Sequence, residues 1–325
     1  MCSRGSALSM RCRSRGAHSH RLPVPDTTAP AKAEPATQSS PVSIEHYENF
    51  PVASWLCPPA LRPAVAAIYH FARTADDIAD EGNASAVDRL ADLLAYGQAL
   101  RQATAGKDNS GRWQHVFEPL AKVIAQHRLP LAPLTDLLSA FAQDAGNPLY
   151  ADRPALLDYC ARSANPVGRL LLHLAGVQDP AAVTQSDAVC SALQLINFWQ
   201  DLSIDLPRGR IYVTLSDARA FGLDPRQLQA GHDSDASRAL VRSLVGWSRA
   251  LMLSGAPLVH RMPGRLGWEL RFVVQGGMRI LAKIEAANFN ALSQRPSVGK
   301  ADFGPMAWRA LHMQNSVFDK SALSP

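Results

Sequence analysis

Long apolar runs, paired cysteines and strand-like alternation are scarce in this chain of 325 residues, and each scarcity excludes a class of protein. No run approaches the roughly 18 consecutive apolar residues of a membrane-spanning helix, so we expect no transmembrane segment, the C-terminal end included. The five cysteines are odd in number, widely scattered and without a C-x-x-C pair. A zinc site and a disulfide framework are therefore not expected, and a reducing compartment is the default.

Segments that alternate Val, Ile, Thr or aromatic residues with polar ones, as strands do, are few. Aliphatic residues and alanine dominate instead, and 47% of the residues are hydrophobic against 19% that are charged. A globular chain of this size can bury one large core. The composition predicts an all-α protein.

Residues 1–42 differ from the rest of the chain. They are rich in Arg and Ser at first and in Pro, Ala and Thr afterwards, which predicts a disordered tail. The same composition fits an organellar transit peptide that lacks a clear amphipathic helix, or a translation start at Met10. Because the tail holds much of the excess Arg and Lys, the net charge of +5 says little about the folded part.

From residue 43 onward the chain reads as helices separated by proline and glycine. No linker or internal repeat divides it, which predicts a single domain over 43–305 and a C-terminal extension over 306–325. No basic segment interleaved with aromatic residues is present, so we expect no nucleic-acid partner. Helical stretches are expected near 60–81, 85–105, 113–127, 132–145, 154–176 (interrupted by proline), 184–205, 235–256 and 265–292.

The segment "YHFARTADDIAD" (69–80) places three aspartates within five residues of an otherwise apolar helix. At 100° per residue, Tyr69, Arg73, Asp76 and Asp80 share one stripe, with Asp77 to its side. Carboxylates four residues apart repel each other unless a cation lies between them. The alternative is a solvated acidic face on which Arg73 pairs with Asp77.

A second polar stripe follows in "LQLINFWQDLSIDLPRGRIYV" (193–213). Gln194, Asn197, Asp201 and Asp205 are spaced by 3, 4 and 4 residues, while the other faces of this helix are apolar. Such a narrow stripe should face something other than bulk water. Asp136 and Asp144, eight residues apart on another helix, face either the same cavity or solvent.

Oxygen ligands without His or Cys favour Mg²⁺ over zinc, and Mg²⁺ commonly completes its shell with water and substrate phosphate. Two such helices facing each other in an apolar bundle would form a pocket with the metal at its mouth and apolar walls below. That pocket suits a long-chain isoprenyl diphosphate, whose binding with Mg²⁺ would neutralise the aspartates.

These motifs resemble those of the squalene/phytoene synthase family of head-to-head prenyl synthases, over roughly residues 43–305. The resemblance rests on "FARTADDIAD", "YCARSANPVG", "LQLINFWQDLSIDLPRGRIYV" and, more weakly, "GGMRILAKIEAANFNALSQRPSVGK". It implies a helical bundle of the isoprenoid (terpenoid) synthase type with a central apolar cavity. Within the family, "ENFPVAS", "SANPVG" and "NFWQD" are most similar to the bacterial hydroxysqualene synthases of hopanoid biosynthesis.

The resemblance also implies roles for particular residues. One group would bind the metal and, with Arg73, carry the catalysis; a second group would contact the diphosphate or line the cavity near the reacting carbons. The first group is Asp76, Asp80, Asn197, Asp201 and Asp205, and the second is Ser54, Tyr69, Arg73, Tyr159, Gln194 and Asn197.

Two positions depart from the wider family. Gln200 stands where squalene-forming and phytoene-forming members usually have arginine, and Thr214 stands where proline is common. The first departure predicts one cationic donor fewer near the second helix and puts a condensation that holds two diphosphates in doubt. The second is interpreted as loop variation.

The expected reaction is the Mg²⁺-dependent conversion of presqualene diphosphate and water into hydroxysqualene and pyrophosphate, a carbon–oxygen lyase reaction without a nicotinamide cofactor. One alternative is a prenyltransferase that condenses two farnesyl diphosphates to presqualene diphosphate or dehydrosqualene. A second is a non-catalytic scaffold that binds prenyl diphosphates. We expect a cytoplasmic protein with peripheral contact at the inner face of the membrane and transient association with neighbouring pathway enzymes.

Overall fold

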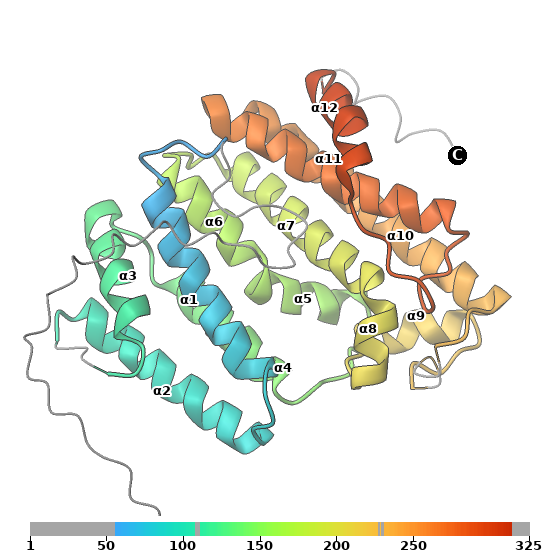
Figure 1. Cartoon of the computed structure of the whole chain (residues 1–325), viewed down its shortest axis with the longest axis horizontal. Helices are drawn as coiled ribbons and strands as arrows, with labels where there is room; N and C mark the ends of the chain where they lie inside the picture. The colour runs from blue at the N-terminus through green and yellow to red at the C-terminus, as the bar shows by residue number, and fades with distance from the viewer. Residues whose placement is uncertain (1–55, 108–110, 227, 229–230, 314–325) are drawn as a thin grey trace, which may run out of the picture. The chain divides into compact units, whose positions relative to one another are not determined.

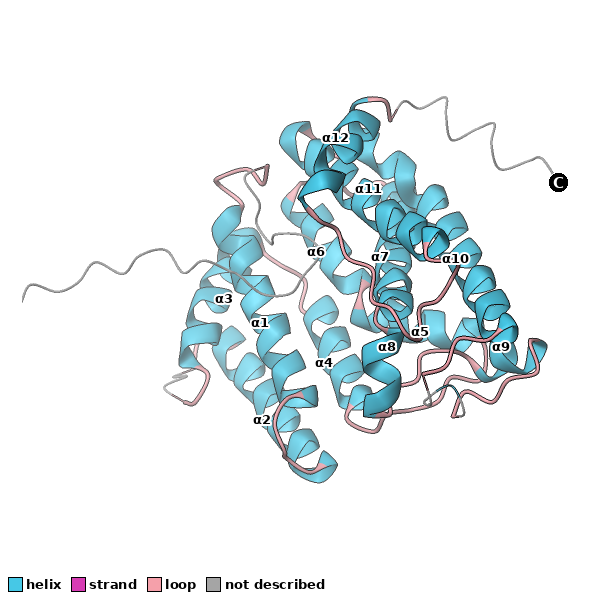
Figure 2. Ribbon diagram, turned by 45° about the vertical axis from the view of Figure 1, so that its right-hand side comes forward, coloured by secondary structure: helices cyan, strands magenta, loops and turns pink. Residues whose placement is uncertain are grey.

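The computed structural model describes residues 56–107, 111–226, 228 and 231–313. Every regular element of this part of the chain is a helix, and no strand is present in it (Figure 2). The prediction of an all-α protein is therefore confirmed. The predicted tail over 1–42 and Ser54 lie outside the described residues.

Twelve α-helices and three 3₁₀ segments make up the described chain (Figure 1). In chain order they are α1 (Arg62–Asp80), α2 (Ala86–Thr104), α3 (Gln114–His127), α4 (Ala132–Asp144), α5 (Arg153–Ser163), α6 (Asn165–Leu174), α7 (Pro180–Gln200), α8 (Leu202–Asp205), η1 (Leu206–Arg208), α9 (Leu215–Ala220), α10 (Asp235–Gly255), η3 (Ala256–His260), α11 (Gly264–Ala286), η4 (Lys300–Asp302) and α12 (Phe303–Leu311).

Two predicted helices are each divided in the structure. The stretch 154–176 breaks at Ala164, whose φ of −122° leaves the helical range, and the next helix begins at Asn165 with Pro166 in its first turn. Proline is favoured at the start of a helix because its missing N–H has no intrahelical partner there. The stretch 184–205 breaks at Asp201, which ends α7 and precedes the short helix α8. Helices α9 and α12 were not predicted, since segments of six and nine residues carry little periodic signal.

Side-chain caps fix many of the helix starts. A Ser, Asp or Thr at the N-cap accepts a hydrogen bond from a backbone N–H of the first turn, which satisfies a donor that would otherwise lack a partner. These residues are Ser85, Asp152, Asp179, Thr214 and Ser234. At the end of α1, Gly82 adopts a φ of +74°, which ends the helix directly after the aspartate motif.

The core is built around α7, which contacts α5, α6, α10 and α11. Its Trp199 is fully buried and donates a hydrogen bond from Nε1 to Ser248 Oγ of α10 at 2.7 Å. A second cluster joins α1 to α2, α3 and α4 around Phe71, Tyr96 and Phe117. Full burial of such side chains contributes about 1.5–3 kcal/mol each. The two clusters hold α1 and α7, the helices with the aspartate motifs, in fixed positions.

None of the described helices combines the length and apolar character needed to cross a membrane. The predicted boundary at residue 305 falls inside α12, which packs against α11.

Candidate active site

A cavity of ≈ 1290 Å³ lies between α1, α4, α5, α6, α7 and the first turns of α11. Pockets for small ligands usually measure about 300–1,000 Å³, so this cavity is large enough for a long chain. Its walls combine aliphatic side chains with a group of carboxylates and arginines.

One face of α1 lines the cavity and changes character along its length. Val65, Ile68 and Ala72 contribute apolar surface from the first half of the helix, and Asp76 and Asp80 follow in the second half. Their spacing of three and four residues keeps them on one stripe. From Val65 to Asp80 the helix rises by about 22 Å at 1.5 Å per residue. The cavity is therefore deep, with its carboxylates at one end.

Helix α7 repeats this arrangement. Val189 and Leu193 face the cavity first, and Gln194, Asn197 and Asp201 follow toward the C-terminal end. The two polar stripes predicted from the sequence thus face the same cavity, and both occupy its carboxylate-lined end. The sequence-predicted residues Tyr69, Arg73 and Tyr159 also line the wall.

Asp205 has a different position from the other predicted ligands. The break at Asp201 places it on α8, and it is not among the described residues that line the cavity. It lies close enough to Asp80, Asp201 and Arg210 for their charges to affect its pKa.

Gln200 does not face the cavity, contrary to the expectation that its identity sets the number of cationic donors there. Its side chain is fully buried, and Nε2 donates a hydrogen bond to the carbonyl oxygen of Pro296 at 2.7 Å. The cavity nevertheless has several cationic side chains. They are Arg73, Arg89, Arg208, Arg210 and Arg295. The position of Gln200 therefore does not support the argument that this residue leaves the cavity one cationic donor short, on which the doubt about a two-diphosphate condensation rested.

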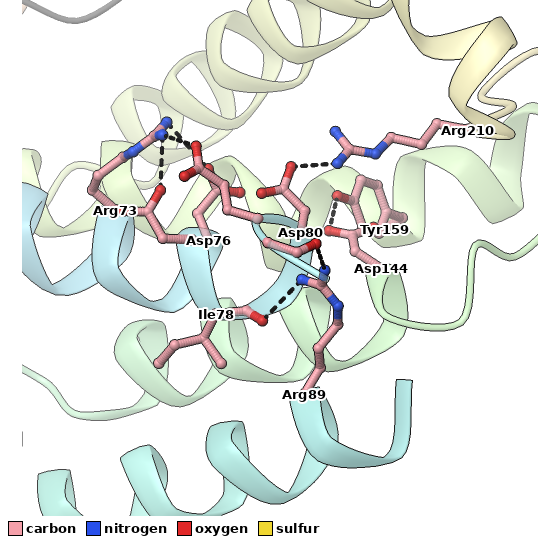
Figure 3. Close-up of polar contacts among 11 residues, drawn as sticks. Arg73, Asp76, Ile78, Asp80, Arg89, Asp144, Tyr159 and Arg210 are labelled. Atoms are coloured by element: carbon pink, nitrogen blue, oxygen red, sulfur yellow. Dashed lines mark hydrogen bonds and ion pairs between the residues drawn. The ribbon is translucent and has the colours of Figure 1, made fainter. Parts of the chain in front are cut away.

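Two of these arginines pair with the predicted metal ligands. Arg210 Nη2 lies 2.6 Å from Asp80 Oδ2 (Figure 3), and Arg295 Nε lies 2.6 Å from Asp201 Oδ1. Sequence analysis did not select either arginine. Arg210 ends the "PRGR" element and Arg295 lies within the last family motif, so both arginines stood in recognised motifs, but the spacing within a motif does not identify a partner from another helix.

Arg73 contacts three acidic side chains at the end of α1. Its guanidinium lies 3.5 Å from Asp76, 2.8 Å from Asp77 and 2.9 Å from Glu81. The pair with Asp77 is the one expected for a solvated acidic face. Both interpretations of this helix therefore hold in part, because Asp76 and Asp80 line the cavity while Asp77 pairs beside it.

Asp144, at the end of α4, joins an aromatic cluster in the wall. Tyr159 donates a hydrogen bond from its hydroxyl to Asp144 Oδ2 at 2.7 Å (Figure 3). The ring of Tyr212 stacks on that of Phe198, with centroids 3.7 Å apart, and lies 6.2 Å from the Tyr159 ring. Asp144, Tyr159 and Tyr212 all line the cavity. Of the two aspartates whose position the sequence left open, Asp144 faces the cavity, whereas Asp136 is not among the described residues that line it.

Three carboxyl groups around the mouth, those of Asp76, Asp144 and Asp205, have raised pKa values. Burial, followed by repulsion from Asp80, raises the pKa of Asp76 to about 7. Burial likewise raises the pKa of Asp144 to about 7, although the hydrogen bond from Tyr159 opposes the rise. Burial and the charge of Asp201 raise the pKa of Asp205 to about 6.

This donor set fits a hard cation. Asp76, Asp80, Asn197 and Asp201 offer oxygen atoms only, and carboxylates crowded together gain stability when a cation binds between them. Among the described residues, no group of three or more His, Cys, Asp or Glu side chains is already placed to hold one metal ion. The oxygens of a bound diphosphate would be needed to complete the coordination from both helices.

Gly168, from the "SANPVG" motif, allows α6 and α7 to approach closely at the cavity wall. A Cβ at this position would lie 2.6 Å from Cys190 Sγ and would also collide with Ser186. The glycine therefore fixes the separation of the two helices, which explains a motif that sequence analysis used only for the resemblance.

Comparisons with known proteins agree with this geometry. A hydroxysqualene synthase from Zymomonas mobilis is 37% identical over 63% of this chain and 67% of its own length. One from Sinorhizobium fredii is 30% identical over 75% of this chain and 81% of its own. The crystal structure of a squalene synthase from Alicyclobacillus acidocaldarius is 38% identical, with a TM-score of 0.69 over 75% of this chain and 90% of the other.

A dehydrosqualene synthase structure, 22% identical, has the same fold, with a TM-score of 0.68 over 77% of this chain and 86% of the other. The sequence pattern described as squalene/phytoene synthase matches residues 44–302, which is most of the chain. The protein belongs to the squalene/phytoene synthase family, whose members are enzymes that act on prenyl diphosphates.

Proposed function

We propose that this protein is a hydroxysqualene synthase that converts presqualene diphosphate and water into hydroxysqualene and pyrophosphate. The cavity supports a prenyl diphosphate substrate, because two helices bring oxygen donors to one end of a deep, largely apolar space. The observation that carries the choice of reaction is the similarity, at 30% and 37% identity, to two hydroxysqualene synthases.

Asp76, Asp80, Asn197 and Asp201, which line the cavity, would hold Mg²⁺, with Asp205 beside them on α8. When bound, the metal would offset the charge of the diphosphate and make it a better leaving group. Arg73, Arg210 and Arg295 stand around the same end of the cavity. Their guanidinium groups can donate hydrogen bonds to diphosphate oxygens, and these bonds strengthen as the C–O bond breaks and negative charge builds up there.

The carbocation left behind would lie against the aromatic part of the wall. The ring faces of Tyr159 and Tyr212 are electron-rich and stabilise positive charge without acting as nucleophiles. The aliphatic walls along α1 and α7 exclude bulk water, so the rearrangement can finish before capture.

We assign Asp144 to the capture step, with Tyr159 orienting its carboxylate. Water would form the new C–O bond, and the proton that it loses would pass to Asp144. A carboxylate with a pKa of about 7 suits this step, because a base is most effective when its pKa lies near the working pH.

A second candidate is the condensation of two farnesyl diphosphates. It is favoured by the number of arginines around the cavity and by the similarity to a squalene synthase. Incubation of the purified protein with each substrate, with Mg²⁺ and without NADPH, distinguishes the two. We expect hydroxysqualene and pyrophosphate from presqualene diphosphate, no turnover of farnesyl diphosphate and no effect of added NADPH. A C30 product from farnesyl diphosphate alone would favour the second candidate, and EDTA should stop turnover in either case.

A further inference from the structure

Exposed apolar side chains gather on α12 and the start of α11. Trp268 is 41% exposed, Phe303 57%, Trp308 65% and Leu311 59%. We call these four residues the α12 patch. Among the described residues, the α12 patch includes every exposed Trp and Phe side chain. Large apolar side chains grouped on a surface generally mark a binding site.

The α12 patch is held rigidly against the bundle. Met306 and Ala310 are buried on the inner side of α12. Arg271 of α11 donates hydrogen bonds to the carbonyl oxygens of Ala310 and Met313 at 2.9 and 3.1 Å, and its guanidinium stacks over the Trp268 ring at 4.7 Å. The exposed side chains therefore belong to a fixed surface.

The patch lies at the apolar end of the cavity. In Figures 1 and 2, related by a turn about the vertical axis, α12 is at the top and α8, beside the carboxylate mouth, is low. Met262, Leu266 and Leu270 line the cavity near the start of α11, where Glu269 is a single acidic neighbour. Trp268 is two residues from Leu266 and from Leu270, so it projects from the opposite side of the helix. The first turns of α11 thus separate the apolar end of the cavity from the patch.

The charge of this region differs from that of the remaining body. Residues 256–313 contain eight Arg and Lys against three Asp and Glu, whereas residues 44–255 contain 18 against 22. Two of the eight pair with acids outside this segment, Arg261 with Asp179 and Arg295 with Asp201 at the mouth of the cavity. Exposed basic residues near the patch include Arg265, Lys300 and Arg309. Tryptophan favours the interface between headgroups and acyl chains, and basic residues favour anionic lipids.

We propose that the α12 patch docks the enzyme on a bilayer surface that contains anionic lipids. Docking there places the apolar end of the cavity beside the acyl region, where prenyl chains and C30 hydrocarbons partition. A symmetric contact with a second copy is disfavoured, because it would bring the exposed basic side chains Arg265, Lys300 and Arg309 of both copies together.

The test is flotation of the full-length protein with vesicles of phosphatidylcholine alone or with 30% phosphatidylglycerol. We expect binding to the anionic vesicles, weakened by 0.5 M NaCl. Trp308→Ser with Leu311→Ser should lower the partition coefficient about tenfold, since each removes apolar area from the interface. The matched control is Val87→Ser with Leu94→Ser on α2, which removes side chains 75% and 69% exposed and should change binding less than twofold. Residues 1–42 are identical in all variants, so their Arg residues do not affect the comparison.

Two results would overturn the proposal. One is equal binding of the α12 variant and the wild type. The other is a lipid-free dimer that the α12 substitutions dissociate, which would make the patch an interface between copies. Brominated lipids should quench tryptophan fluorescence of the wild type more than that of Trp308→Phe at similar binding. Circular dichroism and pyrophosphate release in detergent should be unchanged in every variant, which separates failure of docking from failure of the proposed reaction.

Discussion

Arg210 and Asp80 form an ion pair of 2.6 Å across the mouth of the cavity, joining the segment after η1 to the end of α1. Arg295 and Asp201 form the equivalent pair on the other side, also at 2.6 Å. In each pair an arginine that can bind diphosphate neutralises an aspartate that can bind metal. Binding of both ligands would exchange these partners: each carboxylate would turn to the cation and each guanidinium to the diphosphate.

Asp80→Asn and Asp201→Asn are each expected to lower turnover by at least about 100-fold, or ~2.7 kcal/mol in the activation barrier. The cost in stability should stay within about 1 kcal/mol, because both ion pairs are partly exposed to solvent. Pyrophosphate release and thermal unfolding measure the two effects. Asp235→Asn, at an exposed position on α10, serves as the control. Large destabilisation by both cavity substitutions would show that these aspartates are structural.

Asp76→Asn should stabilise the metal-free protein in a pH-dependent way. The carboxyl titrates near 3.8 in the unfolded chain and at about 7 in the fold, so the folded state binds its proton more tightly. The cost of Asp76 to stability is therefore absent below pH 3.8, grows as the pH rises and is complete above pH 7.

The Asp76 side chain is 40% accessible, and the area it exposes lines the cavity, where solvent screens part of the repulsion. We therefore expect a gain of about 1 kcal/mol at pH 8 and little at pH 4. Urea unfolding in EDTA at the two pH values measures it. Equal stabilisation by Asp76→Asn at both pH values would contradict the assignment of the effect to the raised pKa of the Asp76 carboxyl.

Asp144→Asn should impair the capture of the carbocation by water while leaving the loss of pyrophosphate from the substrate largely intact. Pyrophosphate release from presqualene diphosphate should persist within about tenfold, whereas the fraction of product that is hydroxysqualene should fall in favour of eliminated hydrocarbons. Asp136→Asn, on the same helix, should change neither quantity. An unchanged product ratio for Asp144→Asn would remove this residue from the capture step.

Gly168→Ala should destabilise the fold by about 1–3 kcal/mol, because the added methyl group meets Cys190 and Ser186 of α7. Gly246→Ala on α10 is the matched control, since no atom lies within 4 Å of its Cβ position. That substitution should stabilise the protein by about 0.5–1 kcal/mol through helix propensity. Denaturant unfolding compares the two, and equal effects would argue against close packing of α6 and α7.

The sequence by itself determined the helical class, most of the helices and the two polar stripes. These properties are local, because the spacing of apolar and polar residues fixes which side chains share a helix face. Gly82 and Pro166 likewise mark helix boundaries independently of tertiary contacts. Helical spacing alone therefore groups Asp76 with Asp80, and Gln194 with Asn197 and Asp201.

Only the tertiary structure decided how those faces meet. It joined Arg210 to Asp80 and Arg295 to Asp201, turned Gln200 away from the cavity toward Pro296, and ended α7 at Asp201 so that Asp205 moved aside. Such contacts join segments far apart in the chain, and no periodicity within either segment encodes them. They depend on the packing of α7 against α10, α6 and α11, which sets the direction of each side chain at the mouth.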